Sequence, residues 1–361
     1  MSIGTKTIKK PLNPYRLTSF HREYFLDFKK RFPAKHADRG VVLCEMVPCY
    51  NVSHCFLNSA HVVAEVLSAK VRSFSFYVGK TESWKFWGNY YKECGAPLIL
   101  KNQKPLWTRL SSQIMARALL RTIQKPADVL SIKLGSILAG PLIYQSYLGL
   151  ERATMEIQDP HLFKTILRAC QIYLNCLRCL QKYSVKQVII SHNQYIQYGI
   201  LTRMAISRGV PVITPYAHGW RRSIPFTLRR TDSKTLMPFP PYYKFNRLFA
   251  RLSSRERSQA RILGKQRLRD RLEGRLDLTT LKIGPAYQKK KESCLQSTKK
   301  RKILVMLSCF FDGPNIFRFN LFPDFYQWAI FTFERASLTN YEWYVKPHPV
   351  GLPQNDRVVS E

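Results

Sequence analysis

Short apolar runs that alternate with helical patterns constrain the fold of this chain most strongly. Gly40–Val47 reads as a buried strand, a helix with Ser53 as its N-cap is expected to run to about Lys70, and Val71–Val78 alternates as a second strand. The same order recurs over Val185–Ser191, Tyr195–Arg208 and Gly209–Thr214. Strands and helices in this order are typical of a parallel, doubly wound sheet, so we predict an α/β fold of Rossmann-like type.

A new strand–helix–strand segment begins near residue 301 and ends in a distinctive turn. Ile303–Ser308 reads as a strand, Leu321–Leu338 as a helix, and Tyr341–Lys346 as a strand that leads into Pro347-His348-Pro349. The two prolines restrict this turn and stiffen the position of the histidine between them. Because two strands and one helix cannot cover both faces of a sheet, we expect the domain that begins here to be truncated in this chain.

Composition shifts divide the chain into four segments. Residues 1–39 are a polar, basic lead-in, and residues 40–275 are predicted to form a first Rossmann-like domain. Residues 276–300 are polar and rich in lysine, which is typical of a linker. Residues 301–361 are expected to begin a second Rossmann-like domain.

The net charge of +35 implies an anionic partner, which could be nucleic acid, an anionic membrane face or an anionic substrate. The basic stretch Arg255–Arg275, which Ser253 and Glu256 start with a capping box, is predicted to be helical and carries apolar residues among its arginines. Such a helix can face anionic phospholipid with its basic side, or it can be a solvated basic surface. The net charge is the only feature that favours nucleic-acid binding, because the sequence contains no zinc-finger, RNP1 or KH pattern.

Cysteine usage and hydropathy favour the cytoplasm. The nine cysteines have no regular spacing, and the lone pair Cys176 and Cys179 lies in a helical pattern, so buried reduced thiols are expected. The N-terminus has no apolar signal segment. The most apolar stretch, Val129–Leu150, is interrupted by Lys133 and Pro141, which argues against a transmembrane helix. Peripheral contact with the inner membrane face is a further expectation from the basic helix.

Three segments together resemble a known family of enzymes. They are Val188–Ala205, which contains Ser191-His192-Asn193-Gln194-Tyr195; Phe310–Trp328, which contains Asp312-Gly313-Pro314; and Trp343–Pro349. In order and spacing the chain resembles GT-B glycosyltransferases of bacterial capsule and surface-polysaccharide biosynthesis, the group that includes capsule-type Kdo transferases. The resemblance implies transfer of a sugar from a nucleotide donor, bound mainly by the C-terminal half, to a glycan or lipid-linked acceptor, contacted mainly by the N-terminal half.

The resemblance and the positions of polar residues at strand ends suggest a catalytic and a donor-binding set. His192, at the end of a buried strand, is a candidate general base, although a local hydrogen bond explains it equally well. Glu45 is a second candidate base, because a carboxylate in a buried strand needs a partner or a functional site. His348, Lys346 and Asp312 are candidate ligands of the donor nucleotide.

A third set would line the acceptor side of the cleft, and each member also has an ordinary structural explanation as a turn, cap or wall residue. This set comprises Tyr50, Asn51, Ser53, Gln194, Tyr195 and His218.

Neither a cofactor nor a metal is expected. The sequence contains no Asp-x-Asp triplet and no glycine-rich nucleotide fingerprint. Two alternatives stay open: a glycerophosphotransferase of the CDP-glycerol type, which shares the fold and a similar His-Pro turn, and a basic nucleic-acid-binding protein.

Overall fold

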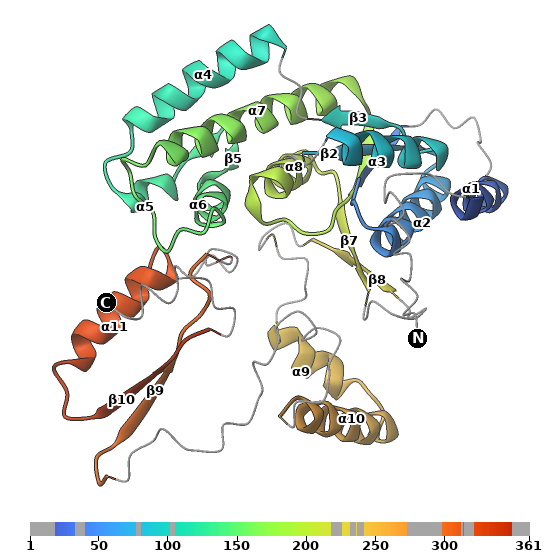
Figure 1. Ribbon diagram of the computed structural model, residues 1–361. Helices are drawn as coiled ribbons and strands as arrows, with labels where there is room; N and C mark the ends of the chain where they lie inside the picture. Colours follow the sequence, from blue (N-terminus) through green and yellow to red (C-terminus); the bar gives the residue numbers. More distant parts are fainter. Residues whose placement is uncertain are drawn as a thin grey trace, which may run out of the picture. The chain divides into compact units, whose positions relative to one another are not determined.

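A mainly parallel β-sheet with helices around it makes this an α/β protein (Figure 1). The computed structural model describes residues 19–32, 40–76, 81–101, 105–217, 226–231, 236, 242–272, 298–311, 313 and 321–348. The chain divides into two units, one made of residues 1–101 and 179–189 and the other of residues 102–178 and 190–361.

The sheet has the strand order β3-β2-β1-β6-β7-β8. Its strands are β1 (Val41–Glu45), β2 (Lys70–Ser75), β3 (Leu98–Lys101), β6 (Val185–Ile189), β7 (Val212–Ala217) and β8 (Phe226–Arg230). β1 pairs in parallel with β2 and with β6, β2 pairs in parallel with β3, and β8 runs antiparallel to β7 at the edge. The predicted α/β class is therefore confirmed, while β3 and β8 were not predicted.

The first unit packs three helices around an aromatic core: α1 (Ser19–Arg31), α2 (Tyr50–Val66) and α3 (Thr81–Glu93). α1 lies within the predicted lead-in. It is held by tertiary contacts, since the Phe25 ring meets the Tyr90 ring edge-on at 5.1 Å and the Phe28 ring lies 4.9 Å from the His61 ring. Two buried phenylalanines spaced by three residues thus outweigh the polar composition of this segment.

Ser53 does not cap α2, so that prediction was wrong. Cys49 is the N-cap residue, and Ser53 lies in the first turn, where its hydroxyl donates to the Val47 carbonyl at 2.5 Å. A serine in the first turn of a helix can donate its hydroxyl to a nearby backbone carbonyl instead of accepting a bond from a helix N–H as a cap does.

The second unit contains most of the helices. They are α4 (Leu106–Arg121), α5 (Pro126–Val129), α6 (Gly140–Leu148), α7 (Pro160–Lys182), α8 (Tyr195–Ser207), α9 (Tyr242–Ala250), α10 (Ser254–Leu272) and α11 (Phe325–Ala336), and α7 runs on into the first unit from Cys179. The apolar stretch from 129 to 150 forms the end of α5, the hairpin strands β4 (Lys133–Leu134) and β5 (Ile137–Leu138), and α6. In the described part of the chain, none of the helices has the length and hydropathy needed to cross a membrane.

The C-terminal segment has the predicted strand–helix–strand order. β9 (Lys302–Met306) and β10 (Glu342–Lys346) form a parallel pair, and α11 connects them. Val305, Leu307, Phe310 and Ala329 are its buried core, whereas Leu304 and Met306 on the other side of β9 are 58% and 64% exposed. The predicted linker at 276–300 lies largely outside the described residues.

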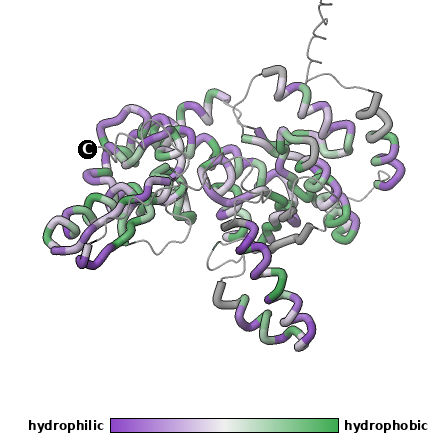
Figure 2. The backbone as a smooth tube through the Cα atoms, turned by 60° about the horizontal axis from the view of Figure 1, so that its bottom comes forward, coloured by the Kyte–Doolittle hydropathy of each residue, from purple (hydrophilic) through white to green (hydrophobic). Residues whose placement is uncertain are grey.

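The capping box that starts the basic helix is confirmed. The Ser253 backbone N–H and hydroxyl each donate to the Glu256 carboxylate at 2.8 Å, and the Glu256 N–H donates back to the Ser253 hydroxyl at 3.3 Å. Hydrophilic and hydrophobic stretches both run along α9 and α10 (Figure 2), and Ile262 and Leu263 are more than half exposed. α10 therefore buries no continuous apolar face.

A glycine allows α8 to pack closely against α6. A Cβ atom on Gly199 would overlap the Leu142 side chain and lie 2.6 Å from the Asn193 carbonyl oxygen. We predict that Gly199→Ala lowers the free energy of unfolding by about 1–3 kcal/mol, the usual cost of overpacking. Gly264→Ala in α10 is the matched control, because nothing lies within 4 Å of its added methyl. It should raise stability by about 0.5–1 kcal/mol. Urea unfolding curves measure both, and equal effects would contradict the close packing.

Candidate functional site

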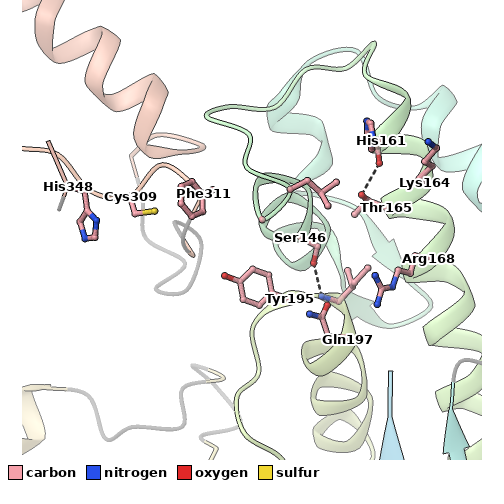
Figure 3. Close-up of a pocket in the computed structure, with 13 residues that line it drawn as sticks. Ser146, His161, Lys164, Thr165, Arg168, Tyr195, Gln197, Cys309, Phe311 and His348 are labelled. Atoms are coloured by element: carbon pink, nitrogen blue, oxygen red, sulfur yellow. Dashed lines mark hydrogen bonds between the residues drawn. The ribbon is translucent and has the colours of Figure 1, made fainter. Parts of the chain in front are cut away.

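A cavity of about 620 Å³ lies within the second unit (Figure 3). Side chains from α6, α7 and α8 line it together with Cys309, Phe311 and His348 from the C-terminal segment. In Figure 3 these three residues lie on one side of the cavity and the α7 and α8 residues on the other. Pockets for small organic ligands have volumes in this range.

One face of α7 gives the cavity its positive charge. His161, Lys164, Thr165 and Arg168 follow the i, i+3, i+4, i+7 spacing of a helix face, and all four line the cavity. Burial lowers the pKa of the Arg168 guanidinium, although an arginine keeps its charge in a protein. Among the described residues that line the cavity, none is acidic. The cavity is therefore suited to an anion.

The N-terminus of α8 meets the same cavity. Tyr195, Ile196 and Gln197 form its first turn and line the space. The Ile196 N–H donates to the Ser146 hydroxyl at 2.9 Å, and the side chain of the N-cap residue Gln194 makes no capping bond. The first turn of a helix presents backbone N–H groups and the positive end of the helix dipole, which favour phosphate or carboxylate.

His348 has the position that the sequence predicts, two residues beyond the end of β10. It lines the cavity together with Cys309 and Phe311, which follow β9. Because β9 and β10 are parallel, their carboxyl ends gather at one edge and bring these residues together.

Asp324 ties this C-terminal segment to the helices of the cavity. Its carboxylate accepts the Tyr144 hydroxyl at 2.6 Å, the Thr154 hydroxyl at 2.7 Å and, as the N-cap of α11, the Gln327 N–H at 2.8 Å. The side chain is buried, and the bonds to it make the burial of its charge tolerable. Burial and the nearby carboxylate raise the pKa of Tyr144, which keeps its hydroxyl protonated as a donor.

A second carboxylate, Asp159, has a side chain that is only 8% exposed and stands at the start of α7. It accepts the His161 N–H and the His161 Nδ1–H, each at 2.8 Å, and the Tyr147 hydroxyl at 2.8 Å. Arg152 Nη2 lies 3.2 Å from it. Hydrogen bonds from His161 lower the pKa of Asp159 to about 2, so the group is ionised at neutral pH.

His192 lies close to the cavity but is not one of its lining residues. Its ring is 4.0 Å from the Tyr198 ring and 6.2 Å from the ring of Tyr195, and its Nδ1 is 2.7 Å from the Ser191 hydroxyl oxygen. Burial lowers the pKa of His192 to about 4. The N-cap position of α8 belongs to Gln194, and the side-chain amide of the preceding Asn193 donates to the Leu236 carbonyl.

The other predicted residues are spread more widely. Glu45 ends β1 and is buried in the first unit, where its carbonyl accepts the Tyr91 hydroxyl at 3.1 Å. Tyr50, Asn51 and Ser53 form the first turn of α2 in the same unit. Their role as acceptor ligands stays a prediction.

Three further predictions concern donor and cleft residues. Lys346 ends β10 with an exposed side chain, and its carbonyl accepts the Leu307 N–H at 2.9 Å. Asp312 and His218 lie outside the described residues.

Sequence reasoning missed the basic face of α7. His161, Lys164 and Arg168 share one side of a helix that was predicted, and their spacing was a visible signal. Solvated helix faces carry the same pattern, so only the packing against α8 and the C-terminal segment distinguishes this one.

Six of the eight cysteines in the described residues are buried thiols, and Cys49 and Cys55 are half-buried. In the part of the chain that the structure describes, they form no disulfide, and no cluster of potential ligands is arranged to hold a metal. Burial raises the pKa of Cys170 to about 12 and that of Cys179 to about 11, so both are protonated at neutral pH.

His192 should make the protein lose stability in mild acid. Its pKa falls from an ordinary 6.5 to about 4 on folding, so the unfolded chain binds the proton more readily between these values. The stability that this group contributes is complete above pH 6.5 and is lost as the pH falls to about 4. We predict that Tm decreases over this range and that His192→Gln makes the decrease shallower. Arg178→Ala, which removes no group that titrates there, should keep the wild-type slope; an unchanged slope in His192→Gln would contradict this account.

Loss of Asp324 should loosen the C-terminal wall of the cavity. We predict that Asp324→Ala lowers the free energy of unfolding by about 2–4 kcal/mol, because it removes a helix cap and leaves one buried and one half-buried hydroxyl without their acceptor. Asp324→Asn should cost less, since asparagine is also a good N-cap. The control Asp128→Ala also removes an acceptor of backbone N–H groups, but one on an exposed helix start, and its effect should be smaller. Thermal unfolding of the three variants checks this order.

Comparison with protein-family models, with curated proteins and with solved structures found no match to this chain.

Proposed function

We propose that this chain is a GT-B-like glycosyltransferase of capsule or surface-polysaccharide biosynthesis, which transfers a sugar from a nucleotide donor to a glycan or lipid-linked acceptor. The observation that carries the proposal is the cavity in which the basic face of α7, the first turn of α8 and His348 come together. The donor is its expected ligand.

The chemistry of the cavity supports a phosphorylated ligand. Arg168 offers a planar set of N–H donors that suits phosphate oxygens, and Lys164 adds a point charge one turn away on the same helix. The first turn of α8 adds backbone N–H groups. Every nucleotide sugar carries negative charge at its phosphates, so a small basic cavity beside apolar and aromatic side chains such as Phe311 and Tyr195 matches it.

The topology supports the same site. α8 follows β6, and His348 follows β10, so both reach the cavity from the carboxyl ends of parallel strands. Ligands of open α/β sheets bind at such ends. The resemblance seen in the sequence implies donor binding at the His-Pro turn. We also propose that the chain has the GT-B arrangement of two Rossmann-like domains.

The residues on α7 and α8 have a clear role in such a reaction. Sugar transfer breaks the bond between the anomeric carbon and a phosphate oxygen, and negative charge grows on the leaving phosphate. That charge would be stabilised by Arg168, Lys164 and the α8 N-terminus. Because these groups are already in place before the reaction, they need not rearrange, and electrostatic catalysis is strongest under that condition.

The size of the cavity favours this function over nucleic-acid binding. A partly enclosed space of about 620 Å³ suits one small molecule, whereas single-stranded nucleic acid needs an extended basic groove with stacking side chains. The glycerophosphotransferase alternative would place CDP-glycerol at the same phosphates, so a donor panel separates the two.

Binding of nucleotides tests the proposal. We predict that at least one of UDP, GDP, CDP and CMP binds the full chain in isothermal titration calorimetry. Arg168→Ala should then weaken binding by about 10- to 100-fold, the cost of one charged hydrogen bond. Arg178→Ala is the matched control on α7, because Arg178 donates to the Thr108 hydroxyl and does not line the cavity.

The donor panel then assays UDP-, GDP- and CMP-linked sugars beside CDP-glycerol, with release of free nucleotide as the readout. Turnover of a nucleotide sugar supports the proposal, and turnover of CDP-glycerol alone points to the alternative. Absence of binding by all four nucleotides would contradict both.

A further inference from the structure

Asp159 and His161 form a hydrogen-bonded pair at the edge of the cavity. Asp159 Oδ1 lies 2.8 Å from His161 Nδ1, and the same oxygen accepts the His161 backbone N–H at 2.8 Å. His161 lines the cavity, and its side chain is 45% exposed, whereas that of Asp159 is 8% exposed. A buried carboxylate therefore holds a histidine that a ligand can reach.

The surroundings of Asp159 fix its position and charge. The Tyr147 hydroxyl donates to Oδ2 at 2.8 Å, and Arg152 Nη2 lies 3.2 Å from the same oxygen. The Asp159 pKa of about 2 leaves the carboxylate ionised and able only to accept hydrogen bonds. The carboxylate thus cannot turn away from the imidazole without giving up several other partners.

This geometry selects one tautomer of His161. An ionised carboxylate accepts, so the imidazole proton belongs on Nδ1, and Nε2 carries the lone pair. Arg152 Nη2 also lies 3.4 Å from Nδ1, but the contact to the carboxylate is shorter by 0.6 Å and decides the assignment. A neutral imidazole with a free Nε2 lone pair is the form that accepts a proton from a substrate.

We propose that His161 is the general base that deprotonates the acceptor hydroxyl, and that Asp159 positions it. This inference rests on the proposed sugar transfer and names a residue for a step which that function leaves open. The α7 face supports it, since Lys164 and Arg168, one and two turns further along, are the expected ligands of the donor phosphates. Acceptor and donor would then meet along one helix face.

The chemical step is a single displacement. His161 Nε2 takes the hydroxyl proton while the acceptor oxygen forms a bond to the anomeric carbon of the donor. The bond from that carbon to the phosphate oxygen breaks, and its electron pair leaves with the nucleotide. The imidazolium that forms is stabilised by the Asp159 carboxylate and later releases its proton to water. One displacement inverts the configuration of the anomeric carbon.

His192 is less well placed for this step. Its Nδ1 contacts the Ser191 hydroxyl, which can donate or accept, so that contact selects no tautomer. In the described structure it does not line the cavity, whereas His161 does.

Kinetics of the full chain with the active nucleotide sugar test the assignment. His161→Ala should lower kcat by about 100- to 10,000-fold, the usual contribution of general base catalysis. Nucleotide affinity, measured by calorimetry, should stay within about threefold of wild type, because no donor phosphate contact is removed. Arg178→Ala, elsewhere on α7, should keep wild-type kcat and controls for disturbance of the helix. Added imidazole should restore part of the lost rate in His161→Ala, which a structural role of His161 would not allow.

Asp159→Asn tests the positioning role without removing the helix cap. It should lower kcat and change KM less. NMR of the protein with ¹⁵N-labelled histidine should show that a smaller fraction of His161 is in the Nδ1–H tautomer. Wild-type kcat in His161→Ala, or a product with retained anomeric configuration, would overturn the assignment while the proposed function stands. If the wild-type chain binds nucleotide but turns over none of the donors, both the His161 assignment and the proposed function are overturned. This outcome is distinguishable from failure of the assignment alone, because in it the wild type itself is inactive.

Discussion

The buried carboxylate of Asp324 is the interaction on which the candidate site depends most. Three donors converge on it, from Tyr144 on α6, from Thr154 and from the first turn of α11. Buried charge is costly unless it is fully hydrogen-bonded, and a fully bonded carboxylate accepts only one arrangement of its donors. The bond to Tyr144 therefore links α6 to the segment made of β9, α11 and β10, which presents Cys309, Phe311 and His348 to the cavity.

The cavity brings together a few of the many basic residues of the chain. A net charge of +35 says only that some anion is attractive. On α7 the same excess becomes specific, because a helix face places Lys164 and Arg168 one turn apart and the α8 N-terminus adds oriented N–H groups. Charge in a small, partly enclosed space is screened less than charge on an open surface, so a few residues there matter more than the many arginines of α10.

Local sequence patterns predicted the helices and strands whose formation depends on residues close together in the chain. The strand Val41–Glu45 is apolar up to its last residue, and Val185–Ile189 is apolar at three of its five positions. The helix predicted from Tyr195 also lies where α8 forms. α1 was missed because its sequence is polar apart from the few phenylalanines that pack on the first unit. β3 was missed because its four residues are too few to show a pattern. β8 was missed because it is an edge strand, whose formation depends on pairing with β7 rather than on its own sequence pattern.

The sequence by itself determined the α/β order of elements and the position of His348 after a strand, because both depend on residues close together in the chain. Only the tertiary structure decided which residues form one site. Tyr195 and His348 were predicted and lie around one cavity, but His161, Lys164 and Arg168 join them through packing that no local pattern records. Asp324 and Tyr144 are 180 positions apart, and a hydrogen bond across such a separation follows from the complete fold alone.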